Sequence, residues 1–282
     1  MMNNQILIST AAFDGYNLAT AIEEIATVGA DGVEVAFIEG YTEPFTEEDF
    51  NQTHADEILS HLKKHGIPCR SFSAHMDLTK ENGVEIFKHR MIFARMLGAD
   101  TIVTNAAPLA KKEEFLSNII QLGQAAKTIG IKIGLENPGD GKANVIDTAS
   151  QAGPVIDEIA METVGLNYDF GNLISHCFEK VKPEEDYRLA LPQTNHYHVK
   201  DVVRQGGGWG FCPIGEGMID YKEILSAIAG DPRPLPVSLE IPLRLARAAD
   251  ASPIRADKRA DLDFIRQVLK RSMDFVRQAL AA

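Results

Sequence analysis

The stretch ARMLGADTIVTN (residues 94–105) shows the local pattern most plainly: an amphipathic segment, a glycine, and then a short run rich in β-branched residues. Glycine readily adopts the left-handed conformation that ends a helix. The same joint recurs in KKHGIP (63–68) and KTIGIK (127–132). A repeated helix–glycine–strand joint is typical of βα units on a parallel sheet.

The number of these units indicates the architecture. Eight strands are expected, at residues 5–10, 32–37, 68–74, 100–105, 132–137, 163–169, 195–201 and 236–241. Helices are expected near residues 17–28, 54–65, 83–97, 112–129, 145–160, 183–190, 220–229 and 257–280. No linker or low-complexity tract interrupts the series. The sequence therefore predicts an α/β protein, with residues 1–282 forming a single (β/α)₈ TIM-barrel domain.

Three stretches lack a regular pattern: residues 38–53, 202–219 and 242–256. Each follows a predicted strand and precedes a predicted helix. In a barrel such segments lie at the C-terminal face, where active sites are built. We expect irregular loops there, with the capacity to act as lids.

Composition narrows the class of partner. The 28 basic and 40 acidic residues give a net charge of −12, which repels a phosphate backbone and argues against nucleic acid. The three cysteines form no CxxC motif, and no apolar run is long enough to cross a bilayer. We expect a cytoplasmic protein with no membrane partner. Its oligomeric state stays open, a homo-oligomer included.

Four consecutive predicted strands, the fifth to the eighth, each carry a metal-ligand type near their C-terminal end: Glu136, Asp169, His198 and Glu240. Each acid alone could pair with a lysine or cap a helix. Together they would bring several negative charges close to one another unless a cation lay among them. Three carboxylates and one imidazole suit a divalent ion such as Mn²⁺, Mg²⁺, Co²⁺ or Zn²⁺. The sequence thus predicts one metal site.

The motifs around these residues extend the pattern along most of the chain. They are GADGVEV (29–35), SFSAHMDL (71–78), GLENPGDG (134–141), LNYDFGN (166–172), HYHVKD (196–201), PIGEGMIDYKEIL (213–225) and SLEI (238–241). With them the sequence resembles the xylose-isomerase-like TIM barrels, which include sugar and sugar-phosphate isomerases and epimerases and the endonuclease IV group.

This resemblance implies roles for the four residues. All four would bind the metal, with Mn²⁺ expected ahead of the other ions. Glu136 and Glu240 would also act as catalytic acid and base, moving the substrate proton through a metal-stabilised enediolate. The expected activity is that of a metal-dependent isomerase or epimerase of a small ketose, keto-acid or sugar derivative.

Five further residues are predicted to bind substrate. Arg204 stands six residues after His198, as an Arg does in the ketose 3-epimerases. Asn172 replaces the His that those epimerases have three residues after the metal Asp, and an amide cannot exchange a proton near pH 7. His75, Glu34 and Lys200 lie near strand ends. The competing interpretation of Arg204 is a solvated surface position. The competing interpretation of His75 is a bond to a backbone carbonyl.

Two other reactions remain open on the same scaffold. A lyase, either a dehydratase or a decarboxylase of a keto-polyol or keto-sugar acid, could use the same enediolate, and Asn172 favours it. DNA repair of the endonuclease IV type is disfavoured. The extra zinc-binding histidines of that group are replaced here by Asn105, Asn172 and the stretch RQGGGWGF (204–211).

Overall fold

Eight parallel strands form a closed barrel in the computed structural model, which describes residues 4–282. Neighbours around the barrel follow the order β1-β10-β7-β6-β5-β4-β3-β2. The strands are β1 (Ile6–Ser9), β2 (Gly32–Ala36), β3 (Cys69–Ser73), β4 (Thr101–Asn105), β5 (Lys132–Glu136), β6 (Val164–Asp169), β7 (Thr194–Val199) and β10 (Val237–Leu239). Seven of the eight lie within the predicted strands, whereas β7 begins at Thr194, one residue before the range predicted for it; the predicted fold class is confirmed. That residues 1–282 are a single domain stays a prediction, and residues 1–3 lie outside the described part.

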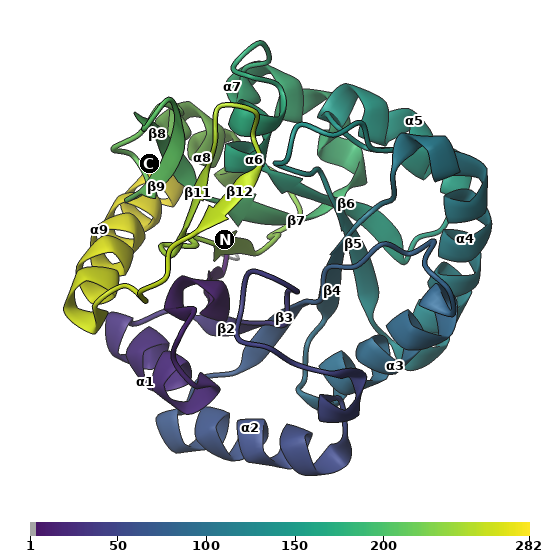
Figure 1. Cartoon of the computed structure of the whole chain (residues 1–282), viewed down its shortest axis with the longest axis horizontal. Helices are drawn as coiled ribbons and strands as arrows, with labels where there is room; N and C mark the ends of the chain where they lie inside the picture. The colour runs from purple at the N-terminus through teal and green to yellow at the C-terminus, as the bar shows by residue number, and fades with distance from the viewer. Residues whose placement is uncertain (1–3) are drawn as a thin grey trace.

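A ring of helices surrounds the barrel (Figure 1). The helices are α1 (Leu18–Val28), α2 (Gln52–His65), α3 (Gly83–Met96), α4 (Lys112–Ile129), α5 (Ala149–Ile159), α6 (Phe170–His176), α7 (Pro183–Asp186), α8 (Tyr221–Ala229) and α9 (Leu262–Leu280). Gly66 and Gly130 have φ values of 65° and 79° and end α2 and α4 in the left-handed conformation. The helix–glycine–strand joint is thus confirmed at these two sites.

Short 3₁₀ helices fill several connections: η1 (Thr10–Phe13), η2 (Glu47–Asp49), η3 (Leu109–Lys111) and η4 (Tyr187–Gln193). The sixth predicted helix, 183–190, is split between α7 and η4. Among residues 4–282, no helix combines the length and the apolar character needed to cross a membrane.

Two of the three stretches predicted to be irregular are instead ordered, and this is a correction. They supply β8 (Asp201–Gln205), β9 (Gly208–Cys212), β11 (Leu245–Arg247) and β12 (Pro253–Arg255), which form an antiparallel sheet in the order β12-β11-β9-β8. Gly208 permits the close approach, since a Cβ there would lie 2.0 Å from the carbonyl oxygen of Arg247. These strands are only three to five residues long, which is too short to show the alternation by which strands are recognised from sequence.

Helix α6 was also not predicted. It begins directly after β6, with the Asp169 side chain accepting a hydrogen bond from the backbone N–H of Asn172. It spans only seven residues, all of them buried, and is too short for a helical period to stand out in the sequence. Its position matters for function, because it brings Asn172 beside the ends of β5 and β6.

Candidate metal centre

Four adjacent strands bring the four predicted metal ligands together. Glu136 and Asp169 are the last residues of β5 and β6, His198 lies in β7, and Glu240 directly follows β10. In the barrel β5 pairs with β6, β6 with β7, and β7 with β10. One ligand atom from each of the four side chains lies within 4.8 Å of the others, and all four residues are buried. The spacing of a parallel barrel therefore produces the cluster that the sequence predicted.

The imidazole of His198 lies among the three carboxylates. Its Nδ1 is 2.7 Å from Oε2 of Glu136, 3.4 Å from Oε2 of Glu240 and 3.8 Å from Oδ2 of Asp169. His198 Nδ1 is buried and, although close to Glu136, forms no well-aligned hydrogen bond, and the buried Oδ2 of Asp169 meets the ammonium of Lys200 at 2.7 Å. Buried nitrogen and oxygen atoms that converge in this way fit a divalent cation.

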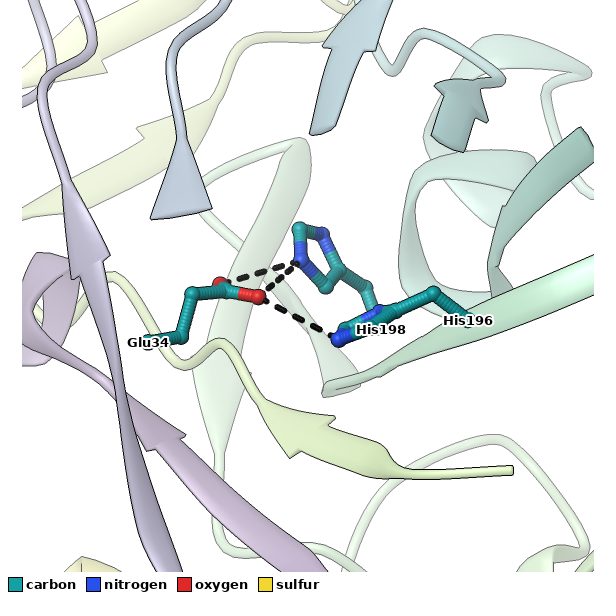
Figure 2. A group of neighbouring side chains, drawn as sticks. All are labelled: Glu34, His196 and His198. Carbon is teal, nitrogen blue, oxygen red and sulfur yellow. Dashed lines mark hydrogen bonds and ion pairs between the residues drawn. The ribbon is translucent and has the colours of Figure 1, made fainter. Parts of the chain in front are cut away.

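Glu34, in β2, sets the orientation of His198 (Figure 2). The Nε2 atom of His198 lies 3.0 Å from one Glu34 carboxylate oxygen and 3.1 Å from the other. Burial alone would raise the pKa of Glu34, but His198 and His196 lower it to about 2. The ionised carboxylate thus accepts from Nε2–H, which leaves the Nδ1 lone pair for a metal.

A buried chain of polar groups runs from Glu34 to Glu136. The Nε2 atom of His196 faces Glu34 at 3.5 Å, and its Nδ1 lies 2.9 Å from Oδ1 of Asn167. Asn167 in turn donates to Oε2 of Glu136 at 2.7 Å. Burial lowers the pKa of His196 to about 4, so this ring is neutral near pH 7. The chain fixes one oxygen of the Glu136 carboxylate.

The other Glu136 oxygen is held by Asn172. The Asn172 amide donates to Oε1 of Glu136 at 2.8 Å and to the carbonyl oxygen of Asn137 at 3.1 Å. Because Oδ1 of Asp169 accepts from the Asn172 backbone N–H, this aspartate turns only its second oxygen toward the cluster. The carboxylates are therefore positioned by their neighbours before any ligand arrives.

Lys200 adds a fixed positive charge. Its ammonium lies 2.7 Å from Oδ2 of Asp169 and also forms an ion pair with Glu240. Burial opposes this charge, but the two carboxylates outweigh it and raise the pKa of Lys200 above its ordinary range. The hydroxyl of Tyr221 donates to the Lys200 carbonyl oxygen at 2.7 Å, which anchors the backbone at this point.

A cavity of about 290 Å³ opens beside the cluster. Glu136 and Glu240 line it, whereas Asp169 and His198 do not. Three of the predicted substrate-binding residues also line it: His75, Asn172 and Lys200. The ring of His75 is held by Ser73 Oγ at 2.8 Å and Asn105 Oδ1 at 3.0 Å. It is a side chain, not a backbone carbonyl, that binds each ring nitrogen.

Glu34 and Arg204 are not among the residues that line this cavity. Glu34 is 0% exposed and lies beneath His198. The Arg204 guanidinium is 2.7 Å from Oε2 of Glu179 and stacks 5.3 Å from the centre of the Trp209 ring. It thus occupies the surface position that was the competing interpretation.

Sequence reasoning missed some of the supporting residues. Asn167 lies two residues before Asp169 on β6, so its side chain points to the same face, and this parity was an available signal. Asn137 carried no such signal. It donates to the Asp169 carbonyl oxygen at 2.9 Å and accepts from the Asp169 N–H at 2.9 Å, contacts that only the folded barrel creates.

Fold and site together define a class, a (β/α)₈ barrel with a carboxylate–imidazole centre at the C-terminal ends of its strands. The chain belongs to the xylose isomerase-like TIM barrel family, whose model matches residues 22–268. No curated protein matches its sequence.

Several solved structures share the fold at low sequence identity. One is a D-psicose 3-epimerase from Clostridium cellulolyticum H10, with a TM-score of 0.77 and 16% identity over 98% of this chain and 99% of that one. A 3-keto-D-glucoside 4-epimerase from E. coli has a TM-score of 0.71 and 17% identity, over 98% of this chain and 100% of that one. A probable 3-DHS dehydratase from Bacillus anthracis has a TM-score of 0.70 and 16% identity, over 97% of this chain and 98% of that one.

Proposed function

We propose that the protein is a metal-dependent isomerase or epimerase of a small ketose, keto-acid or sugar derivative. One observation carries this proposal: of the four clustered ligands, the two that line the cavity are Glu136 and Glu240. Two carboxylates that reach both the metal centre and the substrate space can serve as base and acid. The similar sugar epimerases support this choice of reaction class.

The residues fit the metal that the family implies, and we propose Mn²⁺ ahead of Mg²⁺, Co²⁺ and Zn²⁺. When bound, the ion supplies positive charge that stabilises the anion formed when a C–H proton beside a carbonyl is removed. Glu136 and Glu240 would hold it with Asp169 and His198.

The protein's own groups divide the remaining work. Asn167 and Asn172 hold the two oxygens of Glu136, so its carboxylate faces the cavity in one orientation. Glu240 is held by Lys200 and faces the same cavity. One carboxylate removes the proton and the other returns one. Return to the neighbouring carbon gives isomerisation, and return to the opposite face of the same carbon gives epimerisation.

A lyase is the second candidate, and the environment of Asn172 favours it. The Asn172 amide is engaged with Glu136, and an amide cannot take up or release a proton near pH 7. The likeness to a probable dehydratase points the same way. On this alternative the same proton removal is followed by loss of a β-hydroxyl as water, or the anion is generated by loss of CO₂.

Replacing either carboxylate tests the mechanism. We expect Glu136→Gln and Glu240→Gln to fold and to lose at least about 100-fold in turnover, because an acid–base group is removed from a pre-formed site. The measurement is deuterium incorporation from D₂O into a panel of ketoses and keto-acids. Glu216→Gln, which alters an exposed ion pair with Arg271, is the matched control and should retain full activity.

The products separate the two candidates. Deuterium in a product with an intact carbon skeleton supports the isomerase or epimerase, and loss of water or CO₂ supports the lyase. Near-normal exchange by either glutamine variant would contradict the two-carboxylate mechanism.

A further inference from the structure

Arg247, in β11, is a buried cation that faces the cavity without an anionic partner. It is 8% exposed and lines the cavity next to the metal centre. Among residues 4–282, no carboxylate forms an ion pair with it, and its one hydrogen bond runs from Nη1 to the Ala251 carbonyl oxygen at 3.5 Å. By contrast, Arg244 and Arg255 on the same segment both pair with Asp14, at 3.6 Å and 2.6 Å.

The guanidinium lies close to the groups that hold Glu136. A Cβ placed on Gly139 would be 2.9 Å from Nη2 of Arg247 and 2.5 Å from Oδ1 of Asn172. Both polar groups therefore border the same small gap above Gly139, and Asn172 itself contacts Glu136. The ring of Tyr41 supports the guanidinium from one side, at 5.6 Å from its centre.

A largely buried guanidinium that lines a cavity with free donors favours an anionic ligand, because pairing offsets the cost of burying the charge. Lys200, the other cationic side chain on this wall, is already engaged by Asp169 and Glu240. We infer that Arg247 binds a carboxylate of the substrate, so that the substrate is a sugar-derived keto-acid. This inference rests on the proposed function, whose substrate class it names.

A carboxylate fits this position better than a phosphate. The planar fork of arginine matches the two oxygens of one carboxylate. A phosphate dianion would need further positive groups, yet Glu39, Asp77 and Asp140 also line the cavity. One free guanidinium among these acids suits a monoanion.

The test measures binding without requiring turnover. Calorimetric titrations of the Mn²⁺-loaded protein compare D-gluconate with D-glucitol, which carries CH₂OH in place of the carboxylate, and with D-glucitol 6-phosphate. For the parent we expect gluconate to bind about 10- to 100-fold more tightly than glucitol, as for a charge-assisted bidentate pair. In Arg247→Gln this preference should fall below about threefold, with glucitol binding unchanged.

Two variants control for other effects. Arg271→Gln removes an arginine from an exposed pair with Glu216 and should keep the full preference. Arg247→Lys keeps the charge but not the fork, and should retain only part of it. If Arg247→Gln does not fold by circular dichroism, the parent and Arg247→Lys decide the question.

Three results would overturn the inference: equal binding of gluconate and glucitol by the parent, a gluconate preference that survives in Arg247→Gln, or tighter, Arg247-dependent binding of the phosphate. A gluconate preference that persists in Arg247→Gln would mean that gluconate chelates the metal instead. Failure of the proposed reaction would appear separately, as absence of deuterium exchange with an intact gluconate preference.

Discussion

At the scale of single residues, His198 is the group on which the site depends. Its Nε2 is held by Glu34, while its Nδ1 faces the three carboxylates. Burial would lower the pKa of His198, but Glu34, Glu240 and Glu136 raise it well above its ordinary value. The same negative environment that retains a proton on Nδ1 would retain a metal ion in its place.

Glu34 is therefore predicted to act as a positioning residue. Glu34→Gln keeps an oxygen near Nε2 but removes the charge, and should weaken metal affinity about 10- to 100-fold. Competition with a fluorescent chelator measures this loss. When the variant is saturated with metal, its kcat should change much less than its metal affinity. A general loss of structure would lower both. Glu85→Gln, an exposed change on α3, is the control. Parent-like metal affinity in Glu34→Gln would rule out this role.

Metal binding should also depend on pH. Because the pKa of His198 is raised in the metal-free protein, Nδ1 is still protonated above pH 6.5, and the ion must displace that proton. Affinity should therefore rise with pH, by about tenfold per pH unit below the raised pKa. Calorimetry from about pH 6 to about pH 8, in two buffers of different ionisation enthalpy, counts the released protons. An affinity that is flat over this range would contradict the assignment.

At the scale of elements, Asp201 anchors the segment that follows β9. Its carboxylate accepts backbone hydrogen bonds from Val202, Gly215, Gly217 and Ile219, at 2.9, 3.0, 2.9 and 3.3 Å. A Cβ on Gly217 would lie 2.2 Å from Oδ1 of Asp201, so glycine is required at this close approach. Asp201 directly follows Lys200, and the anchor thereby stabilises the strand end that carries the lysine into the site.

Asp201→Asn should lower stability by about 1–3 kcal/mol, because the amide removes the charge and turns a donor toward backbone N–H groups. Urea unfolding of the variant, compared with the exposed change Asp274→Asn, measures the difference. If both variants unfold at the same urea concentration as the parent, the carboxylate is not an anchor.

Elements with strong local patterns were predictable, and those created by tertiary contact were not. The eight barrel strands carry β-branched runs and glycine joints, and the four clustered ligands follow from strand-end placement. Helix α6 and the strands of the β12-β11-β9-β8 sheet are too short to show a clear period in the sequence. A substrate contact was expected for Glu34 because strand-end placement does not show how deep in the barrel a side chain lies, whereas the barrel places it beneath His198.

At the scale of the whole molecule, the barrel and the added sheet supply different parts of the site. The strand ends hold the four predicted metal ligands, while β11 brings Arg247 to the cavity wall. Figure 1 shows β11 and β12 inside the ring of helices, on the side of α8 and α9. Substitutions in the sheet can therefore change which substrate binds, while the barrel strands keep the predicted metal ligands in place.

The metal content of the whole chain tests the central claim most directly. Purified protein reconstituted with Mn²⁺, freed of excess ion and assayed by elemental analysis should retain about one equivalent per chain. His198→Ala removes the imidazole at the centre of the carboxylates and should retain almost none. A parent protein that retains no divalent metal after reconstitution, or a His198→Ala variant that retains a full equivalent, would contradict the account.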